Sequence, residues 1–209
     1  MELTFKNIIS NEQELREILG HPLELVTQKT INHIDEICST FIENSPFINI
    51  ATSDAQGNLD VSPKGDPAGF VKVLNSKTLA IPDRPGNRKA DTFTNILHNP
   101  NIGLIFLIPG LRETLRVNGE AKIVTDPEVL ELLICDGKKP QFAIIVTVKE
   151  AFMHCAKCMI RSNLWQGLDN SKPRVVPTLG KVLVDHSKMA IDVQELDDAI
   201  KEDEINNLY

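Results

Sequence analysis

The chain has 209 residues, of which 42% are hydrophobic and 24% are charged, proportions that are ordinary for a globular protein. Its formal net charge of −7 argues against a general nucleic-acid binder, which needs a basic surface, but leaves room for a local basic pocket. No run of about 18 apolar residues occurs, so the sequence predicts no transmembrane helix and no membrane partner.

Two further features predict a cytoplasmic protein. The N-terminus, MELTFKNIISNEQELREI, lacks the basic start and apolar run of a signal peptide. The four cysteines are Cys38, Cys135, Cys155 and Cys158. A chain of this length can build a core without disulfide bonds, so we expect these cysteines to be reduced thiols.

Two helices are predicted before the first strand. Residues 11–19 have an apolar face, and residues 27–43 repeat apolar side chains at helical spacing. The apolar face of the second helix consists of Ile31, Ile34, Cys38 and Phe41. Cys38 on this face should act as a small hydrophobe, without a chemical role.

The pattern then changes from helices to strands. FINIATSD (47–54) and LDVSP (59–63) flank a turn at residues 55–58, which is typical of a β-hairpin. TLAIP (78–82) is predicted as a third strand and RKADTFTNILHN (88–99) as a helix with one apolar side.

Three longer strands are predicted in the second half. NIGLIFLIP (101–109) is continuously apolar, so we expect it to be buried on both faces. ETLRVNGEAKIV (113–124) contains Asn118-Gly119, which indicates a bulge or tight bend. QFAIIVTVKEAFMHC (141–155) is expected to bend near Glu150.

Helices and a loop account for the remaining segments. Asp126-Pro127 opens a predicted helix that continues to Leu133, because proline is favoured at the first helical position. CAKCMIRSNLW (155–165) and the acidic segment 192–209 are also predicted to be helical, and NSKPRVVP (170–177) is predicted to be a loop.

About six strands therefore occupy the middle of the chain, and helices flank both ends. Because most strands follow one another through turns, the pattern favours a mainly β fold, an antiparallel barrel with flanking helices, over a doubly wound sheet. We expect one domain over residues 1–209, with a helical addition at 1–44, a barrel core at 45–166, and a C-terminal loop and helix at 167–209.

Three cations gather where the helix at 88–99 begins. Asn87 is a good N-cap residue, so Arg88 and Lys89 would be the first helical residues, close to Arg84. Free backbone N–H groups at a helix start favour an anion, and the three cations would complete a phosphate site. The alternative is a solvated helix start where the neighbouring aspartates neutralise the cations. This segment alone leaves both interpretations open.

Two other segments are weaker candidates for ligand contacts. SPKGDPAGF (62–70) leaves a strand with Ser62 and Lys64, and its glycines allow a backbone to approach a ligand closely. Arg116 lies in the middle of a predicted strand, where a charged side chain either faces solvent or contacts a ligand. An ordinary turn and a solvent-facing arginine remain the simpler interpretations.

The segment after the last strand combines thiols with a possible aromatic contact. Cys155 and Cys158 form a C-x-x-C motif beside His154, but no second ligand pair completes a zinc site and no thioredoxin-like βαβ context is present. We therefore predict no metal site and do not favour thiol chemistry. Arg161 and Trp165 would share one helical face, where Trp165 either lies against a flat ligand or closes the core.

Taken in order, four segments resemble one known family. FINIATSDAQGNLDVSPKGDPAGF, TLAIPDRPGNRKADTFTNILHNPNIGLIFLIPG, ETLRVNGEAKI and CAKCMIRSNLW are similar to the pyridoxamine 5′-phosphate oxidase-like, FMN-binding split-barrel family. The resemblance is greatest to its poorly characterised bacterial branch and covers roughly residues 45–166. The ordered succession of motifs is far more specific than any one of them.

The resemblance implies a split β-barrel homodimer with two FMN sites at the subunit interface. It also implies that two strand ends and the start of one helix contact the cofactor, with the N-R-K segment gripping its phosphate. The matching residues are Ser62, Pro63, Lys64, Ile81, Pro82, Asp83, Asn87, Arg88 and Lys89. It leaves room for Arg116, Arg161 and Trp165 to complete the site, including from the second subunit.

The C-terminus departs from the family pattern. True pyridoxamine-phosphate oxidases end in an R-L-x-P-like segment that helps to hold substrate, whereas this chain ends EDEINNLY, so vitamin B6 oxidation is not expected. The leading hypothesis is an FMN-dependent oxidoreductase acting on an unknown small molecule, with no protein acid or base assigned as catalytic. The alternative is a non-catalytic FMN or haem binding or sensor protein.

Overall fold

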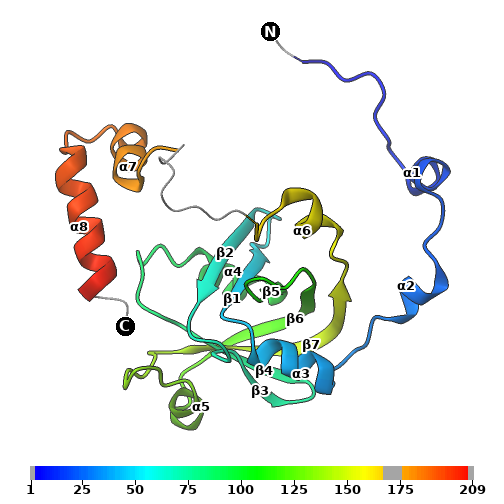
Figure 1. The fold of residues 1–209 in the computed structure, drawn as a ribbon, viewed down its shortest axis with the longest axis horizontal. Helices are drawn as coiled ribbons and strands as arrows, with labels where there is room; N and C mark the ends of the chain where they lie inside the picture. Colours follow the sequence, from blue (N-terminus) through cyan, green and yellow to red (C-terminus); the bar gives the residue numbers. More distant parts are fainter. Residues whose placement is uncertain (1–2, 167–175, 207–209) are drawn as a thin grey trace.

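The computed structural model describes residues 3–166 and 176–206, with a curved antiparallel sheet at its centre (Figure 1). The seven strands follow the order β2-β1-β5-β6-β7-β4-β3, and the sheet does not close into a ring. The strands are β1 (Phe47–Ser53), β2 (Leu59–Gly65), β3 (Lys72–Asn75), β4 (Thr78–Pro82), β5 (Asn101–Leu107), β6 (Thr114–Val124) and β7 (Ala143–His154). The expected mainly β fold with flanking helices is confirmed.

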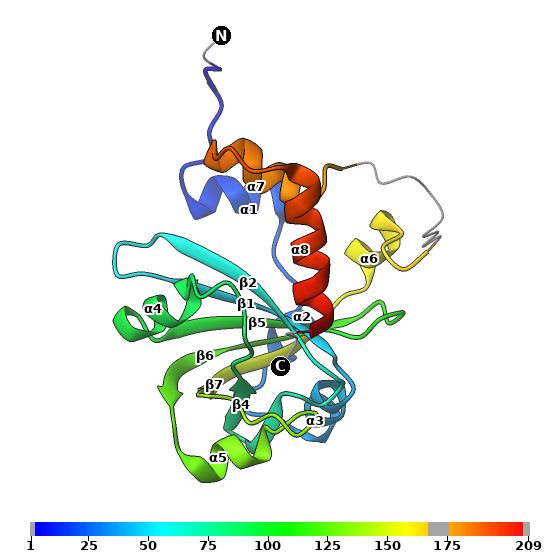
Figure 2. The ribbon, with the colours of Figure 1, turned by 90° about the vertical axis from the view of Figure 1, so that its left-hand side faces the viewer.

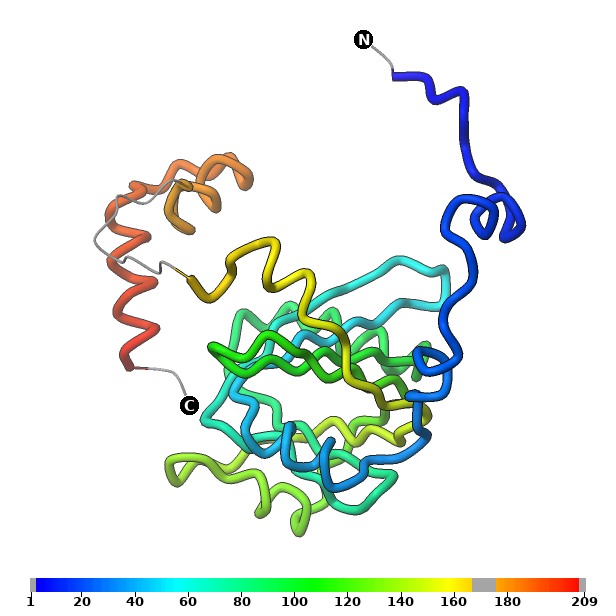
Figure 3. The backbone as a smooth tube through the Cα atoms, turned by 45° about the vertical axis from the view of Figure 1, so that its right-hand side comes forward, coloured from blue at the N-terminus to red at the C-terminus, as the bar shows by residue number. Residues whose placement is uncertain are grey.

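Helices surround the sheet but differ in how closely they pack against it. They are α1 (Glu12–Leu19), α2 (Glu24–Gln28), α3 (Glu36–Glu43), α4 (Asp91–His98), α5 (Pro127–Leu132), α6 (Lys157–Ser162), α7 (Leu179–Ser187) and α8 (Val193–Asn206). Figure 2 shows α4 beside β1 and β2, which it contacts, while α3 contacts β3 and β6. By contrast, α1 and the α7–α8 pair stand away from the sheet on different sides (Figure 3). No helix in the described ranges is long and apolar enough to span a bilayer.

The predicted hairpin is confirmed, and Asp54 explains its turn. The Asp54 carboxylate accepts hydrogen bonds from the backbone N–H groups of Gln56 and Asn58, each at 2.9 Å. Gly57 supplies the positive φ, +87°, that the turn requires. The β1–β2 pairing then continues in register to Phe47 and Gly65, so β2 runs two residues beyond the predicted strand.

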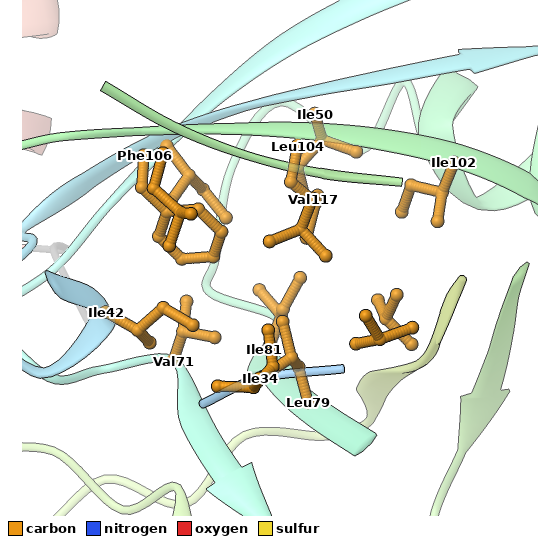
Figure 4. Close-up of a cluster of buried hydrophobic side chains, with 14 of the residues drawn as sticks. Ile34, Ile42, Ile50, Val71, Leu79, Ile81, Ile102, Leu104, Phe106 and Val117 are labelled. Atoms are coloured by element: carbon orange, nitrogen blue, oxygen red, sulfur yellow. The ribbon is translucent and has the colours of Figure 1, made fainter. Parts of the chain in front are cut away.

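The core fills the concave side of the sheet. Alternate side chains of the central strands point inward, and Ile50, Leu104, Phe106 and Val117 lie together in Figure 4. The prediction that residues 101–109 are buried on both faces is wrong, because β5 alternates buried with half-buried or exposed residues. A strand whose outer residues are also apolar looks doubly buried in the sequence.

The long helix predicted over residues 27–43 is also wrong, because it forms two helices. α2 ends at Gln28, and Ile31 instead pairs with Ala151 of β7 through two backbone hydrogen bonds. Asp35 then caps α3 by accepting a hydrogen bond from the Cys38 N–H at 2.8 Å. A capping aspartate and a tertiary strand contact together override the helical periodicity.

The bulge predicted at Asn118-Gly119 is confirmed. Asn118 pairs with Glu150 and Gly119 with Val148, so Lys149 is the extra residue in β7. A Cβ atom at Gly119 would collide with the carbonyl oxygen of Thr147. Glycine is therefore required here by close backbone approach.

The structure corrects several smaller boundaries. The helix predicted over residues 155–165 is limited to α6, because Asn163 is left-handed (φ 51°) and ends it. The four-residue strand β3 and the helix α7 were not predicted. Of the loop predicted at 170–177, only residues 176–177 lie within the described part of the chain. The acidic helix predicted over residues 192–209 is confirmed as α8 as far as Asn206, and residues 207–209 lie outside the described part of the chain.

Candidate functional site

A hollow of about 390 Å³ lies between the end of β2 and the loop that follows β4. Its lining residues are Ser62, Pro63, Lys64, Gly65, Phe70, Pro82, Arg84, Pro85, Gly86 and Asn87. The fold thus brings together two of the segments that the sequence analysis selected. Ile81 does not line the hollow, because its side chain is fully buried in the core (Figure 4).

The loop before α4 differs from the predicted helix start. α4 begins at Asp91, so Asn87 is not its N-cap, and Arg88 and Lys89 are not helical. The Asn87 side chain instead accepts a hydrogen bond from the Lys89 N–H at 3.0 Å, which turns the chain before the helix begins. Asparagine offers both conformations, and the sequence does not distinguish them.

Two left-handed residues and an uncapped helix end mark this loop. Arg88 and Ala90 have φ values of 59° and 62°, a conformation that is unfavourable for residues with a Cβ atom. Ala90 is the N-cap of α4, and no side chain accepts a hydrogen bond from the first turn. The N–H groups of that turn are therefore free of a side-chain cap, as an anion-binding helix start requires. Such local strain is frequent at ligand sites.

The three predicted cations have different environments. Arg84 is nearly buried and pairs with Asp66 at 2.7 Å, and it also donates a hydrogen bond to the Leu133 carbonyl oxygen. Arg84 is therefore a structural cation, and its grouping with the helix start is corrected. Lys89 forms an exposed pair with Asp91 at 2.6 Å. The hydrogen bond and charge of Asp91 raise the pKa of Lys89.

Arg88 is the cation of this loop whose charge is least compensated. It is exposed, and it has no ion-pair partner within residues 3–166 and 176–206. A weakly hydrated guanidinium three residues before a helix that has no side-chain cap suits a phosphate, which it can bind in a bidentate way. The arrangement of Arg88, Lys89 and the α4 start therefore fits the chemistry of a phosphomonoester.

Lys64 reaches from β2 to the face of α4. Its Nζ atom lies 5.2 Å from the centroid of the Phe93 ring, within cation–π range. Phe93 in turn packs edge-on against Phe142, with ring centroids 4.8 Å apart. This contact holds the ammonium group of Lys64 on the α4 side of the sheet.

Asp83 is half-buried beside the same ammonium group. Burial raises the pKa of Asp83, and the charges of Lys64 and Arg84 oppose that shift. Asp83 also anchors the strand end, because its backbone N–H donates to the Phe142 carbonyl oxygen at 3.1 Å. The fold therefore raises the proton affinity of the Asp83 carboxyl group.

Asp60 and Thr92 join the site without having been predicted. One carboxylate oxygen of Asp60 accepts hydrogen bonds from Ser62 Oγ at 2.9 Å and Thr92 Oγ1 at 2.7 Å. These bonds tie β2 to the first turn of α4. Because side chains alternate along a strand, Asp60, Ser62 and Lys64 share one face, and this period-two pattern could have identified Asp60.

Five of the predicted site residues line the hollow: Ser62, Pro63, Lys64, Pro82 and Asn87. Asp83, Arg88 and Lys89 lie next to it in the chain but do not line it, and Arg116, Arg161 and Trp165 do not line it either. Arg116 lies over the Phe152 ring, 5.6 Å from its centroid, on the outer face of the sheet. Trp165 lies beyond the end of α6 and donates an indole hydrogen bond to the Leu111 carbonyl oxygen at 2.7 Å. Arg161 and Trp165 therefore do not share a helical face, contrary to the prediction.

A larger, shallower hollow of about 580 Å³ lies over the β-bulge on the opposite face of the sheet. Its charged residues are Glu120, Lys149 and Glu150, of which Lys149 and Glu120 pair at 3.5 Å. The Glu150 carboxylate accepts a hydrogen bond from Asn118. Acidic charges predominate there, so this hollow does not suit a phosphate.

The described part of the chain contains no group of three or more His, Cys, Asp or Glu side chains arranged to hold a metal ion. Cys155 and Cys158 are exposed thiols, whereas Cys38 is buried. Burial raises the pKa of Cys38 to about 11, so this thiol stays protonated and acts as a core residue.

The family model of pyridoxamine 5′-phosphate oxidase matches residues 34–155, more than half of the chain. The protein therefore belongs to this family. A search of curated proteins found no match.

Several solved structures resemble the fold at low sequence identity. A candidate pyridoxamine 5′-phosphate oxidase from Lactobacillus delbrueckii is 23% identical, with a TM-score of 0.47, over 58% of this chain and 95% of its own. An FMN-binding protein from Syntrophomonas wolfei is 13% identical, with a TM-score of 0.45, over 68% and 93%. The haem storage protein HutZ from Vibrio cholerae is 17% identical, with a TM-score of 0.40, over 57% and 93%.

Proposed function

We propose that the protein is an FMN-dependent oxidoreductase acting on a small molecule. The observation that carries this proposal is the hollow where Ser62, Pro63 and Lys64 face the loop that leads to the uncapped start of α4. Membership of the pyridoxamine 5′-phosphate oxidase family supports the same cofactor.

The residues of the hollow, together with the loop that continues from Asn87 to the start of α4, fit a flavin mononucleotide. Arg88, Lys89 and the first N–H groups of α4 would hold its phosphate. Pro63 and Pro82 offer apolar surface beside the ring system, and Lys64 would stabilise negative charge that develops on it. When bound, FMN supplies the electron or hydride transfer, while the protein binds and orients both reactants.

A homodimer with FMN at the interface completes the proposal. The outer face of the β1–β2 hairpin exposes Phe47, Leu59 and Val61, whose relative exposures are 37%, 81% and 65%. These three side chains share one face of the sheet, because each belongs to the outward set of the register. An apolar surface of this kind is typical of an interface.

The dimer can be tested by sedimentation equilibrium. The wild type is expected to be a dimer, and Val61→Asp should dissociate it, because the variant places a charge on the apolar surface. A monomeric wild type would contradict the proposal.

The rival function is a binding module without turnover, for either FMN or haem. Haem iron is usually held by His, Cys, Met or Tyr, and none of these occurs among the described residues that line the hollow. The side chains that line the hollow therefore suit FMN better than haem.

The visible spectrum of the purified protein distinguishes the two cofactors, since flavin absorbs broadly and haem gives a sharp Soret band. Photoreduction followed by reoxidation with candidate acceptors then separates an enzyme from a module.

The phosphate site can be tested with two ligands. Replacing Arg88 and Lys89 together by Ala should weaken FMN binding by about 1.5–3 kcal/mol for each charge-assisted hydrogen bond that the variant cannot form. Riboflavin has no phosphate, so its affinity should hardly change. Calorimetric titration of both ligands into wild type and variant measures the difference, with Lys122→Ala as a control cation in β6. Equal weakening for FMN and riboflavin would refute the assignment.

A further inference from the structure

We propose that Cys155 and Cys158 form a reversible intramolecular disulfide at the exit from β7, a modification site separate from the flavin hollow. Both thiols are free and exposed, whereas Cys38 is buried and Cys135 is half-buried. Figure 1 shows α6, which carries Cys158, directly after β7. The pair therefore lies in a position that small oxidants and reductants can reach.

The backbone between the two cysteines has a conformation that is compatible with a disulfide. Ala156 has φ −70° and ψ −10°, and Lys157 is the first residue of α6, so the chain makes one right-handed turn. The Ile160 N–H donates to the Ala156 carbonyl oxygen at 3.0 Å, so helical hydrogen bonding begins directly after Cys155. Four residues in such a turn bring the first and last Cα atoms within about 7 Å, and disulfides span about 4.4–6.8 Å.

Two other common uses of paired cysteines have no support among the described residues. A metal site needs further ligands, and the described residues provide no group of three or more donors around this pair. A purely structural role requires burial, as at Cys38, whereas these two side chains face solvent. A C-x-x-C pair with accessible sulfur atoms can undergo thiol–disulfide exchange.

The exchange needs a low-molecular-weight disulfide, such as glutathione disulfide, as the oxidant. The thiolate of one cysteine attacks this disulfide, its S–S bond breaks, and one small thiol leaves with a mixed disulfide on the protein. The second cysteine then attacks the protein sulfur of the mixed disulfide and releases the second small thiol. The protein loses two electrons and two protons overall, and the small disulfide gains both.

The test is a redox titration of the full chain in buffers of fixed ratios of reduced to oxidised glutathione. After acid quenching and alkylation, intact mass and peptide mapping report the state of each cysteine. Wild type should lose two hydrogen atoms, with Cys155 and Cys158 protected together along a single two-electron curve. Cys155→Ser and Cys158→Ser should each retain one glutathionyl group, because no resolving thiol remains.

Cys135→Ser is the matched control and should titrate like wild type. Two separate glutathionyl groups on Cys155 and Cys158, pairing of either with Cys135, or persistence of both thiols in the most oxidising buffer would each overturn the proposal. FMN is not needed in any of these measurements, so their outcome is independent of the function proposed above.

Discussion

The central sheet, with α3, α4 and α5 packed against it, differs from the chain ends in how many side chains it buries. Among the described residues, every buried hydrophobic side chain lies between Ile34 and Ala151, almost the segment that the family model matches. Outside it, α1, α2, α6 and α8 bury no residue in the described ranges, and α7 buries only Gly180. Because apolar burial is the main stabilising term, the folding stability of this protein is concentrated in the central segment.

The chain ends nevertheless carry large apolar side chains. Leu19 and Leu25 are 68% and 78% exposed, and both belong to helices that lie outside the core. The C-terminal pair is held internally, since the Gly180 N–H donates to the Asp197 carboxylate at 2.9 Å. Helical periodicity in a sequence therefore predicts that a helix has an apolar face, but it does not predict whether that face packs against the core.

The largest expected effect is in the core. Phe106→Ala should lower the free energy of unfolding by about 3–5 kcal/mol, because it removes a ring that is fully buried beneath the sheet. Leu25→Ala removes a side chain of similar character from an exposed helix and should change the same quantity by less than about 0.5 kcal/mol. Urea denaturation of both variants measures the difference. Similar destabilisation by the two variants would contradict the conclusion that folding stability is concentrated in the central segment.

A smaller effect is expected within the C-terminal pair. A Cβ atom at Gly180 would lie 2.5 Å from an Asp197 carboxylate oxygen and 3.1 Å from the Asp197 backbone nitrogen. Gly180→Ala should therefore destabilise the packing of α7 against α8 by about 1–2 kcal/mol through overpacking. Hydrogen exchange should quicken in α7 and α8 alone. Faster exchange in β5 or β6 as well would show that the C-terminal pair and the core unfold as one unit.

The smallest effect concerns pH at the margin of the site. The pKa of Asp83 is raised in the folded state, so its contribution to stability is complete below its unfolded pKa and is lost as pH rises through the folded value. Asp83→Asn should therefore be more stable than wild type at pH 7, and this advantage should vanish at acidic pH below about 4. Urea denaturation at both pH values tests the sign. An advantage that grew on acidification would contradict the burial of this carboxyl group.

Much of the architecture could be predicted because strands and turns leave local signals. The β1–β2 hairpin follows from period-two residues around an Asp-Ala-Gln-Gly-Asn turn, and the bulge follows from Asn118-Gly119. The site segments were identified through ordered motifs, and the hollow brings Ser62, Lys64 and Asn87 together. Arg116, Arg161 and Trp165 lie elsewhere on the chain, because a motif order does not specify which segments meet.

The sequence by itself determined the mainly β class, the hairpin, the bulge and the chemical character of the loop at 82–90, since each depends on neighbouring residues. Only the tertiary structure decided that Ile31 pairs with Ala151, that Arg84 is held by Asp66, and that α4 starts three residues after its first cation. The first two outcomes depend on interactions between residues far apart in the chain, and a competing tertiary partner can override any local preference. The third depends on which of two local conformations Asn87 adopts, and the sequence does not distinguish them.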